Sequence, residues 1–156
     1  MNRKSLNYQV ESVEISFLVH ATEDRDRLLH TIRSIIPNQN VEELEFIIDE
    51  MRGYYGNPIS KVKTVIRNRS IAFELVIDIA NRLGFDDKTN LRSDIRQYVD
   101  DSGTLYIRLD KQAIFKGNFI LSISDPIRIK IKLSNKIRGY KEALKLYNKF
   151  GFLGEG

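Results

Sequence analysis

Three cations stand at alternate positions near the end of the chain. Between Asp125 and Leu133 the sequence reads Asp-Pro-Ile-Arg-Ile-Lys-Ile-Lys-Leu, so Arg128, Lys130 and Lys132 alternate with aliphatic residues. Because successive side chains of a strand point to opposite faces, the run predicts a strand with one aliphatic and one cationic face. These cations would lie about 7 Å apart, close to the spacing of phosphates along a nucleic-acid strand. The same pattern also suits an ordinary solvent-facing sheet, so this run alone favours neither interpretation.

Residue patterns for catalysis or metal binding are weak. The chain has no cysteine, which excludes disulfides, thiolate metal sites and cysteine nucleophiles. His20 and His30 lack the spacing of a zinc motif, and we expect structural or surface roles for them. Asp100, Asp101 and Asp110 could hold Mg²⁺ in a nuclease, but aspartates are also expected at helix ends and turns. We therefore predict no enzymatic activity, no cofactor and no metal, and keep a metal-dependent nuclease as the third alternative.

Tyrosines accompany two of the basic segments. Tyr54 and Tyr55 stand in the turn cluster Gly-Tyr-Tyr-Gly-Asn-Pro at residues 53–58, and Tyr106 shares a strand face with Arg108. Exposed rings beside cations can stack unpaired bases, at roughly 1–3 kcal/mol per base. We expect at least one of the two turn tyrosines to pack on its own hairpin instead.

Hydrophobic periodicity predicts the elements that position these groups. Residues 13–19 alternate as a strand, and Thr22 is expected to cap a helix that ends at Pro37. The segment 41–51 suits a helix or a strand, and we favour a hairpin with residues 59–67. That hairpin would set acidic side chains on one strand against basic ones on the other, namely Glu43, Glu45 and Asp49 against Lys61 and Lys63.

The rest of the chain predicts two helices, three strands and a last helix. Ser70 is expected to cap the first helix and Gly84 to be its C′ residue, directly after the C-cap, and a short helix follows within 86–101. The three strands are expected at 105–109, from Gly117 to Ser124 and at 127–133, before a helix over 140–150 that Gly151 terminates. Strands joined by hairpins predict an α+β fold with a mainly antiparallel sheet and helices packed on one face. The other face is then open to solvent or a partner.

The length of 156 residues fits one domain. We place it at residues 11–151, after a flexible N-terminal segment at 1–10 and before a C-terminal tail at 152–156. No apolar leader and no run long enough to span a membrane occurs, so we expect a cytoplasmic protein without a membrane partner.

Charge is divided unevenly along the chain. Residues 103–156 hold 11 Lys and Arg against 4 acidic residues, whereas residues 1–102 hold 14 against 17. A second basic block, from Met51 to Phe73, contains no acidic residue. Such asymmetry favours a polyanionic partner, with nucleic acid ahead of an anionic membrane.

Three strings of residues resemble an archaeal family of RNA-binding proteins. They are His-Ala-Thr-Glu-Asp at 20–24, Gly-Tyr-Tyr-Gly-Asn-Pro-Ile at 53–59, and Arg-Leu-Asp-Lys-Gln-Ala at 108–113, followed by Gly117. The resemblance covers about residues 11–150. It implies RNA binding without catalysis, an association with the exosome in RNA processing or degradation, and a fold similar to the ribosomal protein that binds 5S RNA.

Together these observations predict RNA binding at the open face and rim of the sheet. The expected contacts are Arg108, Lys111, Gln112, Lys116, Arg128, Lys130 and Lys132, joined by Lys61, Lys63, Arg67, Tyr55 and Asn57 from the hairpin. Arg108 and Lys111 lead this set because they belong to a string that carries the resemblance. The alternative is a protein-interaction or assembly subunit whose basic strand docks an acidic partner, including a second copy in a homodimer.

Overall fold

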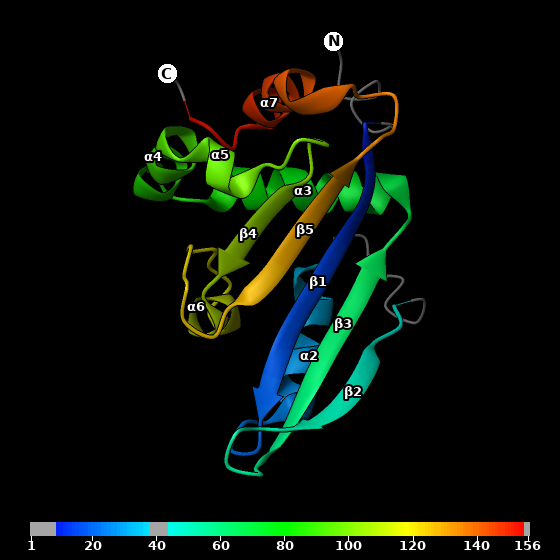
Figure 1. The fold of residues 1–156 in the computed structure, drawn as a ribbon, viewed down its shortest axis with the longest axis vertical. Coiled ribbons are helices and arrows are strands. Elements are labelled where there is room, and N and C mark those ends of the chain that lie inside the picture. Colours follow the sequence, from blue (N-terminus) through cyan, green and yellow to red (C-terminus); the bar gives the residue numbers. More distant parts are fainter. Residues whose placement is uncertain (1–8, 38–43, 155–156) are drawn as a thin grey trace.

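Five antiparallel strands and a layer of helices make up the computed structural model, which describes residues 9–37 and 44–154 (Figure 1). The strands are β1 (Val10–His20), β2 (Ile47–Arg52), β3 (Pro58–Ile66), β4 (Leu105–Leu109) and β5 (Ile127–Leu133). The helices are α2 (Arg25–Ile35), α3 (Arg69–Arg82), α4 (Phe85–Ser93), α5 (Ile95–Tyr98), α6 (Lys111–Phe115) and α7 (Gly139–Phe150).

The strands are ordered β2-β3-β1-β5-β4, and every neighbouring pair is antiparallel. Strands β1, β3, β4 and β5 bury alternate residues, as in Ile127, Ile129 and Ile131, so one face of the sheet supplies the core. Helices α2 and α3 lie behind that face in Figure 1, and none of the described helices covers the opposite face. The predicted α+β fold with helices on one face is confirmed.

The predicted hairpin forms, with β2 paired to β3. Asp49 stands opposite Lys61 in the register, as the charge pattern indicated. Glu45 instead precedes the strand, and its carbonyl accepts a hydrogen bond from the Thr64 hydroxyl at 2.7 Å. Glu43 lies outside the described residues.

Two helices are capped by neighbours of the residues that we expected. Asp24, instead of Thr22, accepts the hydrogen bond from the Arg27 amide at the start of α2. Asn68, instead of Ser70, accepts from the Ile71 amide at the start of α3. Several residues in each stretch can cap a helix, and the one chosen depends on where the preceding loop joins it.

Two glycines were expected at helix ends, and both stand there. Gly84 directly follows Leu83, the C-cap residue of α3, and with a φ of −72° it is also the N-cap residue of α4. Gly151 has a φ of 103° and ends α7, as expected. The chain turns from α3 into α4 without the left-handed residue that would have closed α3.

The segment between β4 and β5 differs from its prediction. Residues 111–115 form helix α6, and Asp110 caps it by accepting from the Ala113 amide at 2.8 Å. The strand predicted from Gly117 to Ser124 is wrong, because its pairing there is limited to one bridge, from Leu121 to Leu109. Apolar residues of this segment are not held on one face: Ile120 and Ile123 are exposed.

Both ends of the described chain take part in the core. Val10 begins β1 and is fully buried, and Phe152, which we had assigned to the tail, is fully buried as well. The two terminal predictions also concern residues 1–8 and 155–156, which lie outside the described residues. Within the described ranges, no helix has the length and apolar character needed to cross a membrane.

Candidate functional site

The open face of the sheet arranges its side chains in rows that run across the strands. One row begins with Arg108 on β4, continues through Arg128 on β5 and Ser16 on β1, and reaches Lys63 on β3. Adjacent strands lie about 4.8 Å apart, so this row spans roughly 14 Å. The sheet therefore brings together cations that are far apart in the sequence.

Arg108 and Arg128 stand directly opposite each other, and both are exposed. Among residues 9–37 and 44–154, no hydrogen bond or ion pair engages either guanidinium. Like charges directly opposite on neighbouring strands are destabilising. Two planar guanidinium groups side by side are, however, well suited to hold an oxyanion such as phosphate in a bidentate manner.

Each of three other predicted lysines of this face has an interaction partner within the protein. Lys63 lies 3.4 Å from Glu14, and Lys132 lies 3.4 Å from Glu11. The Lys130 ammonium sits 5.8 Å from the centre of the Tyr106 ring.

Lys61 is exposed on β3 and has no ion-pair partner in the described chain. It joins Arg108 and Arg128 in a set that we call the open-face cations. These three have the most freedom to meet an external anion.

Tyr106 supplies an aromatic ring between the cations. The side chain is 45% exposed, and its hydroxyl donates to Asp100 at 3.2 Å. Burial, together with the neighbouring Asp100 charge, raises the pKa of Tyr106. The hydrogen bond to Asp100 holds the Tyr106 ring beside Lys130, and the Tyr106 hydroxyl stays neutral. A base could stack on this ring.

The remaining predicted contacts lie at the rim of the sheet. Arg67 directly follows β3 and lines a groove with Lys130 and Lys132. Gln112 and Lys116 are exposed on and just after α6. The hairpin turn carries the other two, Tyr55 and Asn57, which are also exposed.

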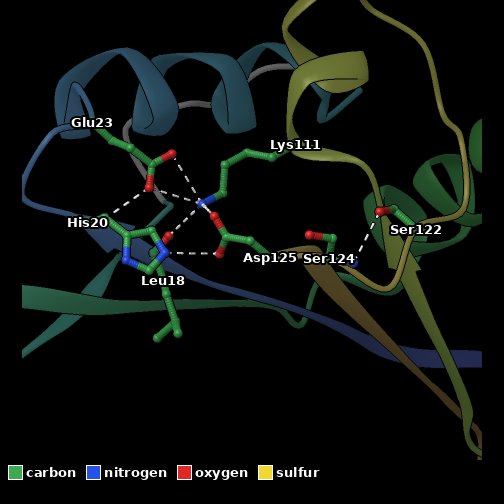
Figure 2. A network of polar contacts seen from close by, with 7 residues as sticks. All are labelled: Leu18, His20, Glu23, Lys111, Ser122, Ser124 and Asp125. Carbon is green, nitrogen blue, oxygen red and sulfur yellow. Dashed lines mark hydrogen bonds and ion pairs between the residues drawn. The ribbon is translucent and has the colours of Figure 1, made fainter. Parts of the chain in front are cut away.

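Lys111 is buried, unlike the other predicted cations, and Figure 2 shows its ammonium directed toward Glu23 and Asp125. It is 4% exposed, and its ammonium donates to the Leu18 carbonyl at 2.8 Å. It also contacts both carboxylate oxygens of Glu23 at 3.2 Å and one of Asp125 at 2.8 Å. These contacts occupy its charge inside the protein, so we assign Lys111 a structural role and leave it out of the proposed phosphate contacts.

The Lys111 network extends to His20, whose Nε2 lies 3.3 Å from the second oxygen of Asp125. Asp125 has a φ of 44°, a left-handed conformation that costs energy in a residue other than glycine. Burial favours a higher pKa for Asp125, but hydrogen bonds and charge from Lys111 and His20 outweigh it and lower that pKa. The network ties β1, the start of α2, α6 and the start of β5 together.

His20, Glu23 and Asp125 place one potential metal ligand each within 4.8 Å of one another. The Lys111 ammonium already contacts both carboxylates, so a side-chain cation offsets one of their two negative charges. Sequence analysis missed this cluster because Glu23 and Lys111 are 88 residues apart. The available signal was that His20, Glu23 and Lys111 belong to the strings that carry the family resemblance.

The three aspartates considered for a nuclease each have a structural partner. Asp100 accepts from the Ser102 and Thr104 amides, and hydrogen bonds lower its pKa although burial opposes this. Asp101 pairs with Arg96 at 2.9 Å, and Asp110 caps α6. The described residues contain one group able to hold a metal ion, and these aspartates do not belong to it.

Tyr54 and Tyr55 project from the β2–β3 turn with 95% and 90% of their surface exposed. The expectation that one of them packs on the hairpin is therefore wrong. Their rings instead contact each other edge to face, with centroids 4.9 Å apart. We call residues 53–57 the hairpin tip.

The three strings that carry the resemblance meet at one end of the sheet. His20 pairs with Ile59 in the β1–β3 register, which brings the end of β1 beside the base of the hairpin tip. His20 also reaches Asp125, which binds Lys111. Figure 1 shows this end of β1 and the hairpin tip at the bottom of the molecule.

Comparisons with known proteins agree with the predicted class. A family model described as RNA binding matches residues 12–133. RNA-binding protein PAB1135 of Pyrococcus abyssi is 30% identical over 128 residues, which cover 80% of this chain and 83% of that protein. An uncharacterized protein of Methanocaldococcus jannaschii, MJ0213, is 34% identical over 113 residues, 69% of this chain and 73% of its own.

Solved structures share the fold. Protein AF2318 from Archaeglobus fulgidus superposes with a TM-score of 0.74 at 24% identity, covering 91% of this chain and 99% of its own. Mth689 from Methanothermobacter thermautotrophicus, a DUF54 protein, superposes with a TM-score of 0.72 at 22% identity, covering 92% and 98%. At these identities the likeness concerns the fold alone.

Proposed function

The chain belongs to the RNA-binding family, and on this premise we propose that it binds RNA through the open face of its sheet. Lys61, Arg108 and Arg128 would be the leading phosphate contacts. Lys63, Lys130, Lys132 and Arg67 would add charge around them, and Tyr106 would offer a ring to a base. The chain would act as a binding protein without catalysis.

The observation that carries this proposal is the facing pair Arg108 and Arg128. Two exposed guanidinium groups without an acidic partner in the described structure repel each other in the free protein. A phosphate between them would remove that repulsion and form charge-assisted hydrogen bonds, which are about twice as strong as neutral ones. The arrangement is unfavourable for folding and favourable for binding an anion.

A pair of charge-matched variants tests the proposal. Replacing Arg108 and Arg128 together by Ser should weaken RNA binding about tenfold or more, since a hydrogen bond to a charged group contributes about 1.5–3 kcal/mol. Replacing Lys145 and Lys149 by Ser removes the same charge from α7, away from the open face, and serves as the control. Equal affinities of the two variants in a titration with labelled RNA would rule out the open face.

We also propose that the bound RNA is a substrate of RNA processing or degradation, with the exosome as a partner. This finer role rests on the family resemblance, as does the similarity to the 5S-RNA-binding ribosomal protein, and we propose a cytoplasmic location as well. Affinity capture with and without nuclease treatment tests it. Loss of the captured proteins after nuclease indicates RNA bridging, and their retention indicates direct contact.

One observation favours protein interaction as the second function. All six residues of β2 are exposed, including Ile47 and Met51, and β2 is an edge strand of the sheet. Exposed edge strands can pair with another chain. A homodimer through β2 predicts a doubled mass in solution, which Met51→Lys should abolish.

A further inference from the structure

The hairpin tip is a preorganised turn that presents two aromatic rings. The Gly56 amide donates to the Gly53 carbonyl at 2.9 Å, which places Tyr54 and Tyr55 at the two central positions of the turn. The Gly53 amide donates to the Asn57 carbonyl at 2.7 Å, and Gly56 has a φ of 80° that favours glycine. The loop is closed by its own hydrogen bonds, so the rings are not needed to hold it.

The exposure of these rings has no structural benefit within the described chain. Each tyrosine ring is among the side chains that gain most from burial, yet both are at least 90% exposed. Among residues 9–37 and 44–154, the one ring contact of either tyrosine is with the other. A fixed pair of exposed rings matches the stacking platforms on which proteins hold unpaired bases.

Cations connect the hairpin tip to the open face. The Arg52 guanidinium, at the end of β2, donates to the Gly56 carbonyl at 3.0 Å, which places positive charge beside the rings. Lys61 follows along β3, three residues beyond Pro58 and thus about 10 Å further. A nucleic-acid backbone that lies on the open face could therefore continue to the tip over a surface that carries positive charge.

From this continuity we propose that the RNA ligand contains an unpaired segment whose bases stack on Tyr54 and Tyr55 while its neighbouring backbone lies on the open face. The inference rests on the proposed function and names the class of RNA: RNA with a single-stranded extension or loop. A fully paired RNA would use the open face alone.

Two probes separate this inference from RNA binding in general. The first is a blunt RNA hairpin, and the second is the same hairpin with a short single-stranded adenine extension that carries 2-aminopurine. The extension should tighten binding to the wild-type protein about tenfold, the equivalent of one stacked base. Stacking on the rings should also change the 2-aminopurine fluorescence.

Variants at the tip assign the effect to the rings. Tyr54→Ser with Tyr55→Ser should abolish the preference for the extension, so that both probes bind equally well, whereas Tyr54→Phe with Tyr55→Phe should keep the preference. Thermal unfolding should be the same for all three proteins because the rings are exposed. Equal affinity of the wild type for both probes, or a preference that survives in the Ser variant, overturns the inference and leaves the proposed function standing. Failure of the wild type to bind either probe overturns both.

Discussion

At the residue scale, the ammonium of Lys111 holds two carboxylates together. Lys111→Ala would leave Glu23 and Asp125 facing each other without a cation. Losing one partner of a fully buried ion pair costs roughly 3–5 kcal/mol, and since Asp125 is 40% exposed we expect about 2–3 kcal/mol. Urea unfolding measures this, with the exposed Lys116→Ala as the control.

A loss below about 0.5 kcal/mol in Lys111→Ala, no larger than for an ordinary surface change, would contradict the structural role of Lys111. RNA affinity provides the second readout. If the variant stays folded, its salt dependence of binding should match that of the wild type, because Lys111 makes no phosphate contact in the proposal.

The lowered pKa of Asp125 predicts how stability depends on pH. A carboxyl group whose pKa is lower in the folded protein contributes stability above its unfolded pKa and loses it as the pH falls through the folded value. The contribution of Asp125 should thus be complete above its ordinary value of 3.8 and decline below it. Asp125→Asn should be less stable than the wild type at neutral pH, and the difference should shrink in acid.

Acid unfolding monitored by circular dichroism checks this prediction. Asp101→Asn, which changes an exposed carboxylate paired with Arg96, is the control and should follow the wild-type curve more closely. A difference between Asp125→Asn and wild type that stays constant from neutral to strongly acidic pH would show that the charge of Asp125 is not responsible.

The facing arginines predict that stability and binding change in opposite directions. Arg128→Ser removes the repulsion with Arg108, so the free energy of unfolding should stay the same or rise by up to about 0.5 kcal/mol. RNA affinity should fall in the same variant. A clear loss of stability would mean that Arg128 has a structural partner and would weaken the case for an anion site.

At the element scale, the short helix α6 depends on its cap. Asp110→Ala removes the acceptor for the Ala113 amide and should cost about 1 kcal/mol of stability, with little effect on RNA affinity. Thermal unfolding with Asp110→Asn as the conservative control measures this, since Asn also caps helices. Metal-dependent cleavage of labelled RNA that disappears in Asp110→Ala would instead revive the nuclease alternative.

Elements with strong periodicity could be predicted from the sequence, and those set by tertiary contacts could not. The alternation in β1, β3 and β5 predicted each of these strands and the open cationic face. Helix α6 is five residues long, and such a helix has too little periodicity to detect. Residues 117–124 contain apolar residues typical of a strand, but they lie at the edge of β4 and pair at one bridge.

The candidate site likewise contains residues whose position could be predicted from the sequence and residues whose position could not. Arg108 alternates with buried neighbours, so its place on the open face followed from the strand pattern. Lys111 is the first residue of the next element, α6, and its burial follows from Glu23 and Asp125, which approach it from other parts of the chain. A sequence pattern shows which face a strand residue occupies and says nothing of partners brought by the fold.

At the scale of the whole molecule, the fold gathers separate segments into two adjoining regions. The open face collects cations from β3, β4 and β5, and the end of β1 collects the three strings that carry the family resemblance. The hairpin tip belongs to the second region and continues into the first along β3 (Figure 1). One RNA could thus contact both regions at once.

The salt dependence of RNA binding tests the central claim most directly. If about four phosphates are neutralised, the logarithm of the binding constant should fall against the logarithm of salt concentration with a slope of about −3. Replacing Lys61, Arg108 and Arg128 together by Ser should bring that slope to about −1.4, since the two arginines share one phosphate and each of the two lost contacts removes about 0.7–0.9. Replacing Lys145 and Lys149 by Ser should leave the slope at its wild-type value. An unchanged slope in the triple variant, or wild-type binding that is indifferent to salt, would contradict RNA binding by the open face.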